Sequence, residues 1–273
     1  MSDIEVMPAR LSREEVEELK RAIACLEGAS FAQRMTDAIG RPLGALTRNA
    51  PAPARRAIAR ASETALAAAL NVALKTIDPT RAANPAGRAH TAAAAALGAV
   101  GGAFGLAALA VELTLTTALL MRSIAEIARE EGEDLSEPEA ALACVEVFGL
   151  GGGEEAAFES GYFAIRAGLA KAVSESSRFV AAQGIPARTA PAVVRLLTQI
   201  AARFGVIVSE KAAAQAAPVL GAIGGAAVNA AFARHFQTLA RGHFIVRRLE
   251  RRHGARAIAF EYRRLRGETA QAA

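Results

Sequence analysis

Several residue types that mark particular protein classes are scarce in this 273-residue chain. Tryptophan is absent, there are two tyrosines, and aromatic residues reach only 5%. Because β-sandwiches and barrels rely on aromatic and β-branched side chains, this composition disfavours an all-β fold. The two cysteines, Cys25 and Cys144, match no metal-binding or redox spacing, so we expect two buried thiols in a reducing compartment.

A secretory signal is also absent from the first residues, which have neither a basic start nor an apolar segment. We therefore expect a cytoplasmic protein. The features described below favour a peripheral position on the inner face of the cell membrane.

Alanine dominates what is present, at about a quarter of all residues, and hydrophobic residues together make up 52%. Apolar residues recur at helical spacing, and short segments rich in glycine or proline separate these stretches. The sequence predicts an all-α protein, a multi-helix bundle forming a single domain over residues 1–273. The glycine-rich residues 149–153 are the candidate hinge.

Local signals mark where some helices begin and end. Ser12 with Glu15, and Ser136 with Glu139, have the spacing of capping boxes, which predicts a helix start at each place. A basic amphipathic segment over residues 241–266 predicts a C-terminal helix, which we expect to break at Gly254.

Two long runs carry no charge: residues 92–111 and residues 212–233. Each is long enough to cross a bilayer. In the first run, six large apolar residues contribute about −3 kcal/mol to the free energy of membrane insertion. Each of its four glycines costs up to ~1 kcal/mol of helix propensity, which offsets that gain. Hydropathy alone therefore does not predict a membrane span. Glycines four apart also let two helices pack closely, and we assign this role to Gly98, Gly101, Gly102, Gly105, Gly221, Gly224 and Gly225.

These runs therefore support two interpretations. They are two central helices of the bundle, packed through glycine, or they insert into or dock on a membrane. In the first interpretation, residues 92–111 and 212–233 touch each other.

Charge is distributed unevenly along the chain. Residues 1–91 have 13 basic and 10 acidic residues (net +3), residues 122–211 have 9 and 13 (net −4), and residues 241–266 have nine arginines against two glutamates (net +7). A basic helix can bind anionic lipid or an acidic partner, or it can simply be a solvated face. The candidate membrane-binding or partner-binding residues are Arg241, Arg247, Arg248, Arg251, Arg252, Arg256, Arg263, Arg264 and Arg266.

Motifs that carry known chemistry are missing. The sequence has no phosphate-binding loop, dinucleotide fingerprint, nucleophile elbow or zinc-protease helix, and no nucleic-acid-binding motif accompanies the basic helix. We expect no cofactor, no bound metal and no catalytic residue, and nucleic acid is an unlikely partner. His235 and His243 are eight residues apart, about 12 Å along a helix, too far for one metal ion. The candidate functional polar residues are Lys211, Asn229, His235, Gln237 and His243.

Several stretches of small and packing residues occur in a characteristic order: residues 101–106, 121–128, 148–152 and 162–166, and, in the C-terminal half, Phe204-Gly205, residues 208–211, residues 218–225, Asn229, and residues 235–237 and 240–244. In this order and combination they resemble the EcsC family of bacterial proteins. The resemblance covers roughly residues 10–254. It implies an association with membrane transport, with an ABC transporter as the partner, and it carries no catalytic mechanism.

Two functions remain open. The first is a non-enzymatic accessory or scaffold protein that docks reversibly on an anionic membrane surface or a membrane protein. The alternative is a hydrolase-type enzyme with a polar site around Lys211, His235 and His243, which would require these side chains to meet in one pocket with perturbed pKa values.

Overall fold

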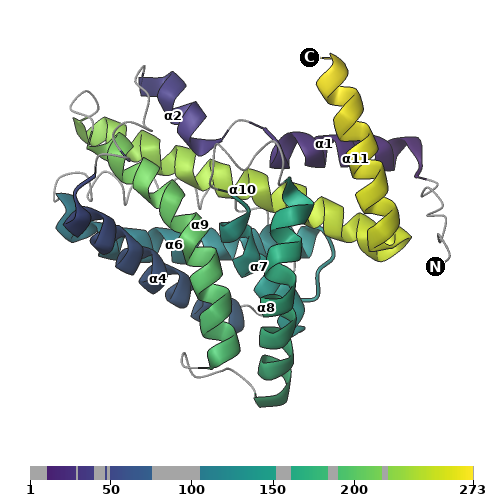
Figure 1. The fold of residues 1–273 in the computed structure, drawn as a ribbon, viewed down its shortest axis with the longest axis horizontal. Coiled ribbons are helices and arrows are strands. Elements are labelled where there is room, and N and C mark those ends of the chain that lie inside the picture. Colours follow the sequence, from purple (N-terminus) through teal and green to yellow (C-terminus); the bar gives the residue numbers. More distant parts are fainter. Residues whose placement is uncertain are drawn as a thin grey trace.

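The computed structural model describes residues 11–28, 30–39, 47, 50–75, 105–151, 161–183, 190–216 and 221–272. Within these ranges it contains helices and no strand, so the predicted all-α multi-helix bundle is confirmed (Figure 1). The helices are α1 (Arg13–Leu26), α2 (Phe31–Ile39), α4 (Ala52–Lys75), α6 (Gly105–Glu130), α7 (Pro138–Leu150), α8 (Tyr162–Gln183), α9 (Pro191–Gln215), α10 (Gly221–His253) and α11 (Ala255–Ala272).

The short helix α7 lies at the centre of the bundle. Every one of its residues over 140–150 is buried, and α4, α6, α8, α9 and α10 all pack against it. A helix that is apolar on every side has no face to present to water, so its neighbours must enclose it. Enclosure of α7 brings together helices that are distant in the sequence.

The long helix α10 is the other organising element, and it contacts α1, α2, α6, α7, α9 and α11. Its Phe232 and Phe236 rings lie 5.0 Å apart, centroid to centroid. Around them is a cluster of fully buried rings in edge-on or tilted contact, contributed by α2, α7 and α9: Phe31, Phe148 and Phe204. Such rings remove large apolar areas from water, and they fix α10 against three other helices.

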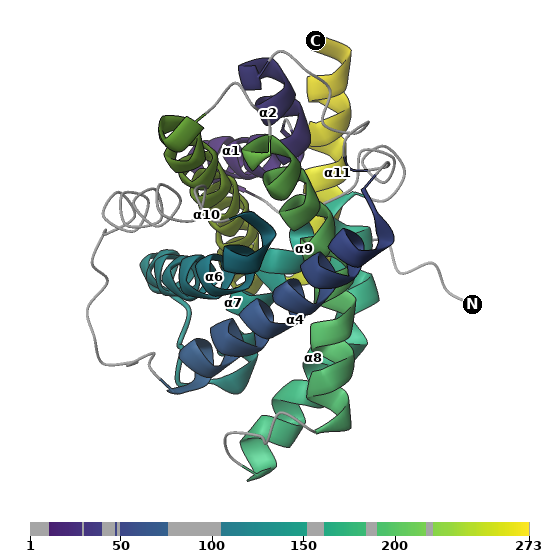
Figure 2. The ribbon, with the colours of Figure 1, turned by 90° about the vertical axis from the view of Figure 1, so that its left-hand side faces the viewer.

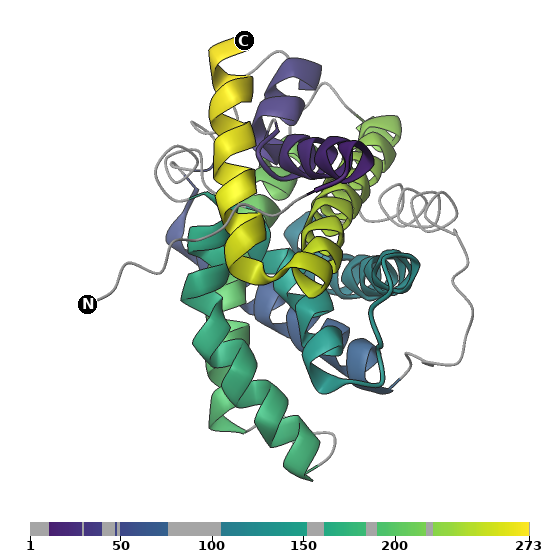
Figure 3. The ribbon, with the colours of Figure 1, turned by 90° about the vertical axis from the view of Figure 1, so that its right-hand side faces the viewer.

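Two of the predicted helix boundaries are confirmed and one is wrong. Ser12 and Glu15 form the capping box of α1, with backbone-to-side-chain distances of 2.9 and 3.2 Å. Gly254 separates α10 from α11 with φ +89°, a left-handed conformation that favours glycine (Figure 3). Ser136 does not cap α7, because its hydroxyl donates to Asp134 at 2.6 Å and the helix starts two residues later, at Pro138.

The predicted hinge at residues 149–153 lies partly in a packed helix. Gly149 belongs to the last turn of α7, and Gly151 directly after the helix is buried. A Cβ atom on Gly151 would lie 2.6 Å from Ile207 Cδ1 and 2.9 Å from His235 Nε2. A side chain here would force Ile207 or His235 to shift, so glycine suits the close approach of α9 and α10. Residues 152 and 153 lie outside the described residues.

The glycines expected to pack helices together are only partly described. Gly98, Gly101 and Gly102 lie outside the described residues, Gly105 begins α6, and Gly221, Gly224 and the buried Gly225 occupy the first turns of α10. A close contact that the sequence analysis did not single out occurs at Gly242, where α1 crosses α10. A Cβ there would lie 2.7 Å from Leu26 Cγ and 2.9 Å from Cys25 Cβ.

Replacing Gly242 by alanine should lower the free energy of unfolding by about 1–3 kcal/mol, because the added methyl overlaps α1. Gly168 of α8 is the matched control: nothing lies within 4 Å of its Cβ position, so alanine should stabilise there by roughly 0.5–1 kcal/mol. Urea unfolding measures both changes. A Gly242→Ala protein as stable as the wild type would contradict the close crossing of α1 and α10.

Candidate functional sites

Lys211 of α9 is fully buried and forms an ion pair with Glu112 of α6. The Lys211 Nζ atom lies 2.6 Å from Glu112 Oε1 and 5.1 Å from the centroid of the Phe232 ring of α10. Burial lowers the pKa of Lys211, and the attraction of the Glu112 carboxylate opposes that shift. The pair links α6, α9 and α10 in the interior, so its evident role is to hold these three helices in register.

The two histidines predicted as candidate polar residues are also buried in separate surroundings. The His235 ring packs against Phe31 and Phe236, and burial lowers its pKa to about 3. His243 Nδ1 shares a 2.9 Å hydrogen bond with the Tyr162 hydroxyl, and burial holds its pKa well below the usual value. Both rings are therefore neutral near pH 7, and the Nε2 atoms of both are buried without a hydrogen-bond partner among the described residues.

The remaining two candidates, Asn229 and Gln237, are buried on α10 as well. The Gln237 side-chain amide donates to Ser123 Oγ of α6 at 3.0 Å. The five predicted polar residues thus make separate contacts inside the bundle. None of them lines the cleft described below. The hydrolase interpretation therefore gains no support from this cleft, and no three His, Cys, Asp or Glu side chains of the described ranges lie together as a metal site.

Removing one member of the Lys211–Glu112 pair should be costly, because the other charge is then buried alone. We expect Lys211→Met to lower the free energy of unfolding by about 3–5 kcal/mol, and the double variant Lys211→Met with Glu112→Leu to recover most of the loss. Chemical denaturation of the two single variants and the double variant measures the coupling. Additive losses in the double variant would show that the pair is not coupled.

The C-terminal arginines predicted to face a membrane or partner are mostly paired within the protein. Ion pairs to glutamates of α1, α7, α11 and the segment after α6 engage six of the nine: Arg247, Arg248, Arg251, Arg252, Arg264 and Arg266. At the centre, Glu133 is buried and receives both Arg247 and Arg251. Burial works to raise the pKa of Glu133, but the two arginines outweigh it and the net shift is downward.

This arginine–glutamate interface fastens the end of α10 to the rest of the bundle. Arg241, Arg256 and Arg263 are exposed, and none of them has an ion pair with a described residue. The net charge of +7 that the sequence assigns to residues 241–266 is therefore largely balanced by glutamates in the fold, and these three arginines are the ones without an ion pair among the described residues.

The opposite end of α10 carries no charge and lies beside the start of α6. Three links join α6 and the segment after it to α10, and they occur in the same order along both. Glu112 is joined through Lys211 of α9 to Phe232, Ser123 accepts a hydrogen bond from Gln237, and Glu133, just after α6, pairs with Arg247. The two helices are therefore parallel, and their uncharged first turns share one end of the molecule. Figure 2 looks onto this side, with α10 above α6. We call it the uncharged end, made of residues 105–121 of α6 and 221–233 of α10.

Two large apolar side chains at the uncharged end are exposed. Val111 is 66% exposed and Leu115 is 48% exposed, one helical turn apart on the same face of α6. By length and composition α9 is the one described helix that could span a membrane, with 39% of its most apolar window buried. It contributes Leu196, Ile200 and Phe204 to the core, which is ordinary for a central helix of a bundle.

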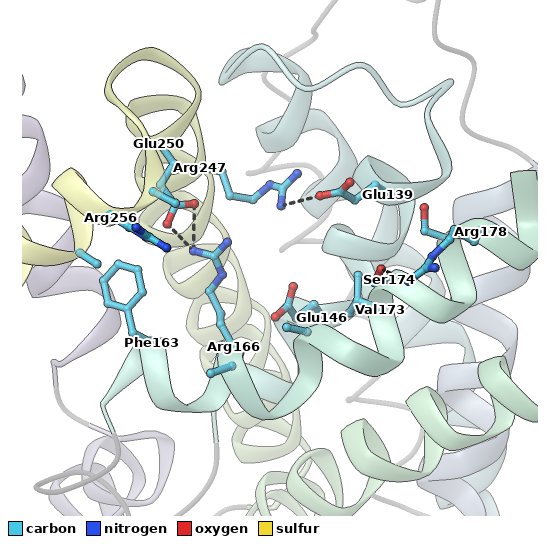
Figure 4. Close-up of a pocket in the computed structure, with 15 residues that line it drawn as sticks. Glu139, Glu146, Phe163, Arg166, Val173, Ser174, Arg178, Arg247, Glu250 and Arg256 are labelled. Atoms are coloured by element: carbon cyan, nitrogen blue, oxygen red, sulfur yellow. Dashed lines mark hydrogen bonds and ion pairs between the residues drawn. The ribbon is translucent and has the colours of Figure 1, made fainter. Parts of the chain in front are cut away.

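A cleft of about 590 Å³ lies between α7, α8, α10 and α11, and sequence reasoning missed it. Figure 4 shows Arg166, Arg247, Glu250 and Arg256 around it, with Glu146 of α7 directed toward the first two. Glu146 is 4% exposed, and no described residue makes a hydrogen bond to it. Burial raises its pKa to about 7, although Arg166 and Arg247 lie near enough to oppose the shift.

Glu146 could have been suspected from the sequence by one signal. It is the single charged residue within the apolar residues 140–150, where every helix face is hydrophobic. An acid in such a segment is buried whichever way the helix is turned. What the sequence could not supply is the cleft, because its walls come from α8 and α11, and the latter is more than one hundred residues away in the chain.

Glu146 should make stability depend on pH in a defined window. The usual pKa is 4.5 and the folded value is about 7, so between these values the folded state keeps a proton that the unfolded chain has released. Stability from this group therefore falls as pH rises through the window, by about 3 kcal/mol in all. Glu146→Gln should match the wild type below pH 4.5 and exceed it by that amount above pH 7, as measured by urea unfolding at several pH values.

Glu139→Gln is the control for that measurement, because Glu139 is on the same helix and 67% exposed. It removes the same formal charge without removing a buried acid. A stability difference between Glu146→Gln and wild type that stays constant from pH 4 to 8 would show that Glu146 ionises normally in the folded protein.

Comparison with known proteins identifies one family. The model of the EcsC protein family matches residues 13–249, which include α1 through nearly all of α10 and both sides of the uncharged end. No curated protein and no solved structure matches the chain. The expected resemblance is thus confirmed as a family match, and the function has to be argued from the geometry.

Proposed function

The chain belongs to the EcsC protein family. Because its predicted polar residues make separate contacts in the described part of the chain, we propose that it is a non-enzymatic accessory or scaffold protein that docks reversibly on an anionic membrane surface through its uncharged end. The observation that carries the proposal is the parallel packing of α6 and α10, which gathers at one end of the molecule two helix segments whose one charged residue, Glu112, is buried and paired.

The buried ion pair is what makes this end uncharged. In sequence, Glu112 interrupts the apolar stretch of α6, and a charge there would oppose contact with lipid. In the folded protein the Glu112 side chain is 6% exposed and pairs with Lys211. The first charged residue exposed on α6 is therefore Arg122, and the first on α10 is Arg234.

This order of residues suits shallow insertion at a membrane surface. Val111 and Leu115 supply exposed apolar area, and Arg122 follows them on the same helix, where its guanidinium can reach lipid phosphates. Two such side chains contribute about 1.5–3 kcal/mol each when fully buried, and an arginine near anionic lipid about 1 kcal/mol. The sum is a few kcal/mol, which gives reversible docking.

The basic C-terminal helix has a smaller part in this proposal than its composition suggests. Six of its nine arginines already hold glutamates of the same chain, so lipid would have to compete with formed ion pairs. Docking should therefore depend more on apolar contact than on salt. This separates a membrane-surface protein of the present kind from one that is held by a polybasic tail.

The proposal is tested by flotation of the purified protein with vesicles of phosphatidylglycerol and phosphatidylcholine. Wild type should bind the anionic vesicles, and Val111→Asp or Leu115→Asp should reduce binding at least tenfold, because each variant removes apolar contact and adds a repelled charge. Val194→Asp is the matched control, since Val194 is 42% exposed at the start of α9, far along that helix from Lys211.

Membrane fractions of cells expressing the protein give a second readout. A docked protein should leave the membrane in a carbonate wash, and retention would show that the chain spans the bilayer. A protein that ignores anionic vesicles at low salt, or whose binding is the same in all three variants, would overturn the proposal. A membrane protein such as a transporter would then be the remaining partner for this surface.

A further inference from the structure

The cleft beside α7 is lined partly by apolar and partly by charged side chains. Helices α8 and α11 contribute apolar side chains: Phe163, Ala167, Ala170, Val173, Ala255 and Ala259. Opposite and around them lie the charged residues of α7, α8, α10 and α11 (Figure 4). Its volume of about 590 Å³ is within the range of small-molecule sites, which combine an apolar lining with a few placed polar groups.

Most of the charges around the cleft are already satisfied. Arg166 holds both oxygens of Glu250, at 2.9 and 3.0 Å. Arg247 binds Glu133 at 2.8 Å, outside the cleft, and lies 3.9 Å from Glu139. These groups are neutral as pairs, so they give the cleft little net attraction for a ligand of either sign.

The charges left without a carboxylate partner among the described residues are both positive. Arg256 of α11 is exposed and has no ion pair, and Arg178 of α8 donates only to the Ser174 hydroxyl, at 3.1 Å. In Figure 4 these two side chains lie on opposite sides of the cleft. An entering molecule that satisfies them must carry negative charge.

Glu146 lies between them in the floor of the cleft. Its carboxyl group has no hydrogen bond or ion pair with any residue that the structure describes and is nearly inaccessible to solvent, yet it lines the cavity. The ionisable groups around it are Tyr162 and Arg166 of α8, Arg247 and Glu250 of α10, and Glu139 of its own helix. As a neutral acid it can donate a hydrogen bond to an anion, and as a carboxylate it would repel one.

We propose that this cleft is a binding site for a small amphiphilic anion, a carboxylate or phosphate head on a short apolar chain. Arg256 and Glu146 bind the head, and the α8–α11 wall covers the chain. Since burial raises the pKa of Glu146 to about 7, binding should weaken as pH rises through neutrality. The site is separate from the uncharged end of α6 and α10, so it stands or falls independently of membrane docking.

Isothermal titration calorimetry with octanoate, octyl phosphate, inorganic phosphate and octylammonium tests the proposal. Octanoate or octyl phosphate should bind, and the tighter of the two identifies the head group. Inorganic phosphate should bind more weakly, because it leaves the apolar wall uncovered. Affinity for octanoate, whose own charge is constant in this range, should fall about tenfold between pH 6 and pH 8, following the protonated fraction of Glu146.

Two variants and a control make the test specific. Glu146→Gln keeps a neutral hydrogen-bond donor, so its affinity at pH 8 should equal its affinity at pH 6. Arg256→Ala should weaken binding at least tenfold, whereas Arg263→Ala, an exposed arginine of the same helix outside the cleft, should leave it unchanged. Thermal unfolding of each variant verifies the fold.

Several outcomes would overturn the proposal. Binding of octylammonium at least as tight as that of octanoate would mean that Glu146 takes a cation. Octanoate affinity that is unaffected by Arg256→Ala would place the anion elsewhere. Absence of binding by every probe to correctly folded wild-type protein would show that the cleft takes no such ligand.

Discussion

Enclosure of α7 is the constraint on which the rest of the structure depends. The helix has no polar face, so five other helices must surround it. Because the phenylalanine cluster packs α10 on α7, the two ends of α10 lie against different parts of the bundle. One end meets the start of α6, and the other meets α1 and the segment after α6. The uncharged end and the cleft beside α7 both result from this packing.

The distribution of charge is a second consequence of the same packing. A buried pair removes the charge of Glu112 from the surface of α6, and the arginine–glutamate interface absorbs most of the positive charge of the C-terminal helices. Ion pairs at partly exposed positions each contribute little to stability. Their main effect is to reduce the unpaired charge on the protein surface. What remains is an uncharged end, a few unpaired arginines, and a cleft whose buried acid has no partner.

Structural and functional polar residues are easy to confuse in such a bundle. Lys211, His235 and His243 are the residues that a search for chemistry selects, yet Lys211 is paired with Glu112, His243 shares a hydrogen bond with Tyr162, and burial keeps His235 neutral. Glu146 matches no functional motif in the sequence, but it is a buried acid that lines a cavity. A polar residue gains a function only where space is left beside it.

The sequence by itself determined the helical fold, the Ser12 capping box, the break at Gly254 and the family. These depend on spacing within one segment or on the order of segments, which a sequence displays directly. It failed at Ser136, where a local cap competes with Pro138, and it overestimated the free charge of residues 241–266. Only the tertiary structure decided which of the charges on different helices are paired, that α6 and α10 run parallel, and where the cleft opens, because these depend on side chains that meet from positions more than eighty residues apart.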